Sequence, residues 1–149
     1  MSVIIEVAES ASTELLEAIN HLVPQLSSSA VAVTGDQLEA MVTSDCLTVF
    51  VARSGGAIVG TLTLATFPIP TGLRAWIEDV IVDEESRGLG IGESLTIAAL
   101  DVARARGART VDLTSRPSRM AANALYKRLG FVQRETNVYR FFIDNDPLT

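Results

Sequence analysis

Cysteine and histidine are almost absent from this chain, which has one of each, Cys46 and His21. A single cysteine excludes a disulfide within the chain, and one cysteine with one histidine leaves no Cys/His set for a metal ion. We therefore predict a protein without a metal site. Cys46 precedes an apolar run and is expected to be a buried or half-buried thiol rather than a nucleophile. His21 falls in a helix-like segment, where surface or core packing accounts for it.

Basic charge is also scarce, with 12 Lys and Arg against 18 Asp and Glu, a net charge of −6 and a pI of about 4.7. Sequence-independent binding of nucleic acid needs a cationic surface, so we expect no nucleic-acid partner. An acidic protein can attract a cationic substrate such as an amine, although mild acidity is also ordinary among cytoplasmic proteins.

Long apolar runs are missing as well, because none approaches the roughly 20 residues of a membrane-spanning helix. The first residues lack the basic start and the apolar stretch of a signal peptide. These absences predict a cytoplasmic protein with no membrane partner.

What the chain does have is material for one core. Hydrophobic residues make up 48% of its 149 residues and the mean hydropathy is +0.30, which predicts a single domain over residues 1–149. Periodicity and turn residues predict strands and helices in the order β-α-α-β-β-β-α-β-α-β-β. The expected strands are Val3–Val7, Leu47–Arg53, Ala57–Phe67, Leu73–Val82, Thr110–Thr114, Phe131–Gln133 and Val138–Ile143. The expected helices are one from Ser10 or Ser12 that ends or kinks at Pro24, one opened by a capping box at Thr34, Gly90–Ala105 and Ser118–Leu129.

This order predicts an α/β (α+β) domain, with a mixed central sheet of about seven strands and about four helices. The three strands between Leu47 and Val82 are joined by short turns and should be antiparallel. The strand–helix–strand unit from Leu73 to Thr114 needs a crossover, so its two strands should be parallel.

A glycine-rich turn between a strand and a helix is the most informative segment, and it reads Arg87-Gly88-Leu89-Gly90-Ile91-Gly92-Glu93. Glycines let the backbone approach a ligand closely, and the following helix presents free N–H groups, so the turn suits a pyrophosphate. A P-loop is excluded because no Lys follows, and the dinucleotide fingerprint fails because its third glycine position is Glu93 or Leu95. A glycine-rich turn without a ligand is the weaker reading.

Three segments in this order resemble the GNAT superfamily of N-acetyltransferases. Arg87–Gly92 matches the Q/R-x-x-G-x-G/A signature, Ile77–Asp83 is similar to the family's fourth strand, and Ala122–Phe131 is similar to its A-x-x-L-Y-x-x-x-G-F segment. The resemblance is close from about Ala52 to Tyr139.

The resemblance implies an acetyl-CoA-dependent N-acetyltransferase, with acetyl-CoA as co-substrate in a cleft between the fourth and fifth strands. The pantetheine arm would pair with backbone of the fourth strand, and the pyrophosphate would sit on amides of the turn, with its first residue positioning the turn. The implied cofactor-binding residues are Val80, Ile81, Val82, Arg87, Gly88, Leu89, Gly90, Ile91, Gly92 and Glu93, together with Asn123 and Tyr126 of the later helix.

Tyr126 is the implied catalytic acid, because the family uses a tyrosine at this helix position to protonate or stabilise the CoA thiolate. A core aromatic is the plain alternative, but Tyr126 lies off the centre of the apolar stripe of this helix. Many members carry Asn seven residues before this tyrosine, where this chain has Arg119. The CoA contact therefore falls to Asn123 or to Arg119, and both stay open.

Glu78 is the candidate general base, since an amine with a pKa near 10 must lose a proton to attack the thioester. Simple alternation puts Trp76, Glu78 and Val80 on one strand face, but a β-bulge would change this phase. Asp79 or a water chain thus remain alternatives, as does a carboxylate that is only solvated or paired. The Glu78-Asp79 pair resembles glucosamine-phosphate N-acetyltransferases, but their acidic residue after strand five is not evident at Thr114-Ser115-Arg116.

The acceptor is left open as a small-molecule amine or a peptide, whose choice the resemblance assigns to Ala8–Asp45 and Arg134–Asp144. A non-catalytic acyl-CoA sensor is the rival from another class, and it would need neither Tyr126 nor Glu78. The edge strands of the expected C-terminal hairpin favour a homodimer.

Overall fold

The computed structural model describes residues 2–144, so Met1 and residues 145–149 lie outside the description. Its contacts divide the chain into two compact units, Met1–Leu113 and Thr114–Thr149, and each is described by itself. The single domain over residues 1–149 stays a prediction.

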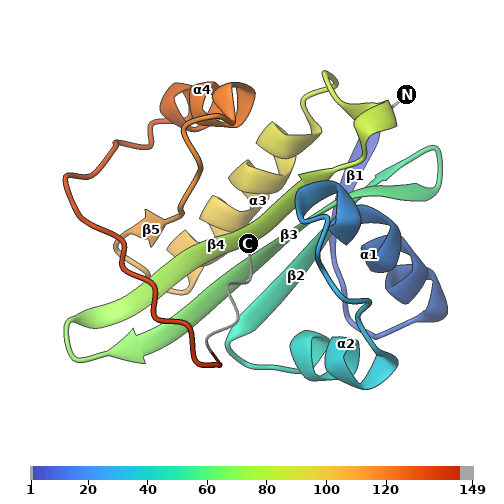
Figure 1. Cartoon of the computed structure of the whole chain (residues 1–149), viewed down its shortest axis with the longest axis horizontal. Helices are drawn as coiled ribbons and strands as arrows, with labels where there is room; N and C mark the ends of the chain where they lie inside the picture. The colour runs from blue at the N-terminus through green and yellow to red at the C-terminus, as the bar shows by residue number, and fades with distance from the viewer. Residues whose placement is uncertain (1, 145–149) are drawn as a thin grey trace. The chain divides into compact units, whose positions relative to one another are not determined.

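The first unit is built on a five-stranded sheet with the order β1-β2-β3-β4-β5 (Figure 1). The four neighbours β1 to β4 are antiparallel, whereas β4 and β5 are parallel, which confirms the predicted mixed sheet. The strands are β1 (Val3–Val7), β2 (Leu47–Ser54), β3 (Ala57–Ile69), β4 (Gly72–Val82) and β5 (Val111–Asp112).

The helices of this unit begin where their capping residues predict. The helix α1 (Thr13–Leu26) begins after Ser12, whose hydroxyl accepts from the Leu15 amide, and α2 (Gly35–Val42) begins with the expected capping box at Thr34. Pro24 does not end α1, which continues to Leu26. The 3₁₀ turn η1 (Glu84–Ser86) and the helix α3 (Ile91–Ala105) follow β4.

Helices cover both faces of the sheet (Figure 1). On one face Val51 packs with Leu15 and Ile19 of α1 and Leu38 of α2. On the other face Gly60 packs against α3. A Cβ built at Gly60 would lie 3.2 Å from side-chain atoms of Ile91 and Leu95. The sheet is therefore the middle layer of the unit, with α1 and α2 on one face and α3 on the other.

Cys46 is exposed, which corrects the expected buried or half-buried thiol. It occupies the turn between α2 and β2, where its amide donates to Ser44 Oγ at 3.1 Å and its carbonyl accepts from the Thr66 amide at 2.8 Å. The backbone here continues the edge of the β2–β3 ladder, and this pairing leaves the side chain outside the core.

The second unit contains the helix α4 (Met120–Arg128), which is shorter than the predicted Ser118–Leu129. The predicted strands Phe131–Gln133 and Val138–Ile143 are wrong for residues 131–143, which carry no strand, so the described sheet has five strands rather than about seven. These segments are rich in β-branched and aromatic residues, which favour strands, but a strand also needs a hydrogen-bonded neighbour. The expected hairpin edges are absent from the described residues, so the argument for a homodimer loses its support.

None of the helices in residues 2–144 has the length and apolar character needed to cross a bilayer.

Gly60 is predicted to tolerate no larger side chain. Its Cβ position lies 3.2 Å from the Ile81 carbonyl oxygen as well as from Ile91 and Leu95, so Gly60→Val would overpack the contact between β3, β4 and α3. We expect a loss of about 1–3 kcal/mol in the free energy of unfolding, measured by urea denaturation. Gly35→Val is the matched control, because an added Cβ at Gly35 meets nothing within 4 Å. Equal stabilities of the two variants would contradict this packing.

Candidate functional site

A bulge in β4 decides which carboxylate faces α1. Thr63 pairs with Glu78 and Thr61 pairs with Ile81, so two steps along β3 match three along β4. The extra residue lies at Asp79, whose φ of 48° is in the left-handed region. Residues opposite each other in a ladder point to the same face, so Glu78 and Ile81 both lie on the face that α1 and α2 cover. The bulge therefore changes the phase of simple alternation.

The parallel ladder between β4 and β5 is short. In residues 2–113 it consists of the pairs Ala75–Val111 and Trp76–Asp112. Arg74 holds this end, with its Nη2 donating to Asp112 Oδ2 at 3.2 Å and its guanidinium 5.2 Å from the centre of the Trp76 ring. Past Trp76, β5 no longer pairs with β4. From Ile77 to Val82 the backbone of β4 therefore has no pairing with β5. This stretch forms an edge with which an extended ligand could pair.

The 3₁₀ turn η1 follows this edge, and the glycine-rich turn then leads into α3. Gly88 and Gly90 have φ values of 82° and 76°, which disfavour other residues. The helix α3 begins at Ile91, one residue later than the predicted start at Gly90. Gly90 is its N-cap residue and provides no side-chain hydrogen bond. The first amides of α3 are therefore not capped by this residue and suit an anion.

The residues predicted to contact the cofactor differ in exposure. Ile81 and Ile91 are buried and serve the core, so any contribution to a ligand comes from their backbone. Arg87 is exposed, and its Nε lies 3.4 Å from the Val82 carbonyl oxygen, a long contact back to the end of β4. The others on β4, the turn and α3 are half-buried or exposed: Val80, Val82, Gly88, Leu89, Gly90, Gly92 and Glu93.

Glu78 has the electrostatics of a basic carboxylate. Partial desolvation raises the pKa of Glu78 above its ordinary value, and the negative charge of neighbouring Asp79 raises it further. The side chain nevertheless stays exposed. A carboxylate with a raised pKa binds a proton more tightly, which is the property that a general base needs.

Tyr126 and Asn123 belong to the second unit. Burial raises the pKa of the Tyr126 phenol, against the opposing effect of the positive charge of Arg119. Its ring meets that of Phe131 edge-on, with 5.6 Å between centroids. Asn123 Nδ2 donates to the Arg116 carbonyl oxygen at 2.9 Å, so this side chain braces the loop before α4. Arg119 is the N-cap residue of that helix.

Sequence reasoning missed a contact between α1 and the start of the turn. His21 Nε2 donates to Asp83 Oδ2 at 3.0 Å, and the Glu84 amide donates to Gln25 Oε1 at 2.9 Å. His21 is thus an interacting surface residue rather than one explained by packing alone. No local pattern could have shown this, because the partners are about sixty positions apart in the chain.

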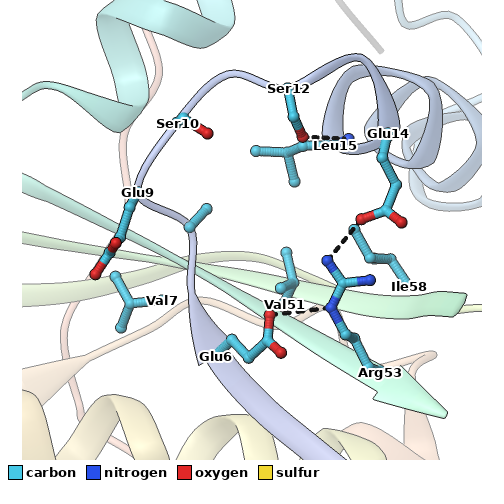
Figure 2. A pocket seen from close by; sticks show the side chains of 11 residues that line it. Glu6, Val7, Glu9, Ser10, Ser12, Glu14, Leu15, Val51, Arg53 and Ile58 are labelled. Atoms are coloured by element: carbon cyan, nitrogen blue, oxygen red, sulfur yellow. Dashed lines mark hydrogen bonds and ion pairs between the residues drawn. The ribbon is translucent and has the colours of Figure 1, made fainter. Parts of the chain in front are cut away.

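A separate pocket lies between β1, β2 and the start of α1 (Figure 2). Arg53 stands between two glutamates there, donating to Glu6 Oε2 at 3.0 Å and to Glu14 Oε1 at 2.6 Å. The hydrogen bond from Arg53 lowers the pKa of Glu14. These charges satisfy one another, so the pocket is explained as an ion-paired junction of the two strands with the helix.

Within residues 2–144, no three His, Cys, Asp or Glu side chains gather as a metal ion would require.

Comparison with known proteins identifies the family of this chain. The sequence model described as "Acetyltransferase (GNAT) family" matches residues 14–131, which is most of the chain. The chain belongs to the GNAT acetyltransferase family. This family generally uses acetyl-CoA as co-substrate.

Two curated relatives show the range of acceptors in this GNAT family. N-alpha-acetyltransferase 30 of Schizosaccharomyces pombe is 39% identical over 74 residues, which are 50% of this chain and 49% of that protein. Glucosamine 6-phosphate N-acetyltransferase of Trypanosoma brucei brucei is 37% identical over 90 residues, which are 58% of this chain and 59% of that protein. The matches thus span about half of these relatives.

The fold is shared with solved acetyltransferase structures. A putative acetyltransferase from Agrobacterium tumefaciens is similar with a TM-score of 0.83 and 29% identity, covering 93% of this chain and 99% of that one. This likeness confirms the predicted fold class, apart from the number of strands.

Asp79 is predicted to raise the pKa of Glu78 through its charge. Asp79→Asn removes that charge, and asparagine also tolerates the left-handed φ of the bulge. We expect the pKa of Glu78 to fall in the variant while staying above the ordinary glutamate value, because desolvation remains. A carbon-detected NMR titration of the Glu78 carboxyl measures this. An unchanged or higher pKa would contradict the arrangement.

Proposed function

We propose that this chain is an N-acetyltransferase that transfers an acetyl group from acetyl-CoA to a primary amine. The observation that carries the proposal is the β4 edge, which no longer pairs with β5 past Trp76 and is followed, after the short 3₁₀ turn η1, by the glycine turn and the start of α3. A strand edge suits an amide-bearing pantetheine arm, and a helix N-terminus suits a pyrophosphate. Both features occur next to each other in a chain of the GNAT family.

In this proposal the cofactor is bound mainly by backbone. Val80, Ile81 and Val82 offer main-chain groups to the pantetheine arm, and the amides from Gly88 to Glu93 receive the pyrophosphate. Arg87 positions the turn through its contact with the Val82 carbonyl oxygen. Asn123 has two proposed roles. Its side-chain amide donates to the Arg116 carbonyl oxygen and so braces the loop before α4, and the same residue is proposed to contact CoA.

The chemical step is a direct attack of the amine on the thioester in a ternary complex. The amine loses a proton to Glu78, whose raised pKa makes it a stronger base than an ordinary glutamate. The amine nitrogen forms a bond to the acetyl carbon as the bond from that carbon to sulfur breaks. Tyr126, which like an ordinary tyrosine is protonated at neutral pH, gives its proton to the departing CoA thiolate.

The proposed acceptor is a small-molecule or peptide primary amine. One of the two curated relatives is named an N-alpha-acetyltransferase and the other a glucosamine 6-phosphate N-acetyltransferase, so peptides and small amines both belong in the test. The net charge of −6 favours a cationic acceptor over an anionic one. A non-catalytic acyl-CoA sensor is the alternative function.

Gly90→Glu is predicted to abolish acetyl-CoA binding. A carboxylate at the proposed pyrophosphate site would repel the phosphates and fill the space beside the first amides of α3, and the φ of 76° adds strain. Isothermal titration calorimetry should show a loss of affinity of at least about 100-fold, since each 1.4 kcal/mol is tenfold. Gly56→Glu is the control, because Gly56 also has a positive φ and open space around its Cβ position, but lies in the β2–β3 turn. Retained affinity in Gly90→Glu would refute the pyrophosphate site.

Tyr126→Phe is predicted to lower turnover while acetyl-CoA still binds. Loss of a general acid typically costs about 10²–10⁴ in rate, and the phenylalanine ring keeps the edge-on contact with Phe131. A thiol-release assay with a panel of small amines and peptides measures kcat, and calorimetry measures binding. Equal turnover in both proteins would remove the acid assignment. Binding without release for every acceptor in the wild type would favour the sensor.

A further inference from the structure

Two side chains of α1 hold the chain where β4 ends and η1 begins, just before the glycine turn. His21 and Gln25 are four residues apart on the helix and therefore share one side of it. His21 Nε2 donates to Asp83 Oδ2 at 3.0 Å, and the amide of Glu84 donates to Gln25 Oε1 at 2.9 Å. The first contact thus holds the side chain of Asp83, and the second holds the backbone of Glu84.

Asp83 is the junction of this network. Its amide donates to the Val59 carbonyl oxygen of β3 at 2.8 Å, and its own carbonyl oxygen accepts from the Ser86 amide at 2.8 Å. Its carboxylate accepts from the Glu85 amide through Oδ1 at 3.2 Å and from His21 through Oδ2. The side chain of Asp83 is 16% exposed. Asp83 therefore joins β3, the first turn of η1 and α1.

The helix that carries these contacts is firmly packed. Leu15, Ile19 and Leu22 of α1 are buried at 3%, 8% and 0% exposure. His21 and Gln25 hence project from a rigid support toward the end of β4. Beyond η1, Gly88 and Gly90 have no side chain that could hold the turn, and the contact of Arg87 Nε with the Val82 carbonyl oxygen is long at 3.4 Å. Glycines leave a chain many conformations, so the entry to the turn needs an external hold.

We propose that His21 and Gln25 are positioning residues that preorganise η1 and the glycine turn after it, over residues 84–90, for the pyrophosphate of acetyl-CoA. This inference rests on the proposed function. They act through Asp83 and Glu84 and do not touch the reacting atoms. A site whose amides already point in the binding direction pays less ordering entropy when the ligand arrives, so the contacts with α1 strengthen cofactor binding. They leave the chemical step unchanged.

The test uses His21→Ala, Gln25→Ala and the double variant, with Glu17→Gln as a control on an exposed position one turn before His21. One hydrogen bond contributes about 0.5–1.5 kcal/mol, so each single variant should raise the Kd for acetyl-CoA about 2–10-fold. The KM for acetyl-CoA should rise in parallel, whereas kcat at saturating acetyl-CoA should stay within about twofold of the wild type. The control should leave both constants unchanged.

Amide hydrogen exchange in the protein without ligand supplies a readout that needs no cofactor. The amides of residues 84–90 should exchange faster in the variants, while the unfolding midpoint in urea shifts little. Unchanged exchange would overturn the role of α1 in holding the turn. Faster exchange with an unchanged Kd, or a fall in kcat with no change in KM, would overturn the role in cofactor binding. Failure of the wild type to bind acetyl-CoA would instead refute the proposed function and this inference with it.

Discussion

The break in pairing along β4 is the constraint on which the candidate site depends. A parallel neighbour along the whole of β4 would consume the main-chain groups that an extended ligand needs. The ladder with β5 stops at Trp76, and the bulge at Asp79 follows within three residues. A β-bulge bends its strand and increases the local twist, so β4 changes direction after Asp79. The sheet thereby keeps a stable antiparallel side toward β3 and an edge toward the glycine turn.

The same bulge also distributes the side chains of β4 between the two helix layers. Ile77 pairs with Leu64 on the face of α3, whereas Ile81 pairs with Thr61 on the face of α1 and α2. Ile77 and Ile81 can therefore both be buried, each against the helices on a different face of the sheet. Glu78 comes to the face of α1 at the point of this change and remains exposed. One extra residue thus sets the packing of the strand and the direction of its carboxylate together.

Desolvation raises the pKa of both proposed catalytic groups. The shift makes the Glu78 carboxylate a better proton acceptor, whereas it makes the Tyr126 phenol a weaker acid than an ordinary tyrosine. Charged neighbours then act in opposite directions, since Asp79 adds to the shift of Glu78 and Arg119 opposes that of Tyr126.

Local chemistry in the sequence determined much of this protein. The capping residues Ser12 and Thr34, the alternation in β2 to β4 and the glycines before α3 act over a few neighbouring residues, and the predicted elements from Val3 to Ala105 follow them closely. The glycine turn was found for the same reason, because its spacing within the chain is itself the signal. Family resemblance then indicated the cofactor.

Tertiary structure alone decided the rest, since the deciding partners are far apart in the chain. Aromatic and β-branched residues made Val138–Ile143 look like a strand, but a strand also needs a hydrogen-bonded neighbour, which the local sequence does not specify. Apolar residues after Cys46 suggested a buried thiol, yet pairing of its carbonyl with Thr66 leaves it exposed. The bulge at Asp79 and the contact of His21 with Asp83 likewise arise only when β3, β4 and α1 are packed together. Short-range preferences thus set the elements, and long-range hydrogen bonds and packing set the site.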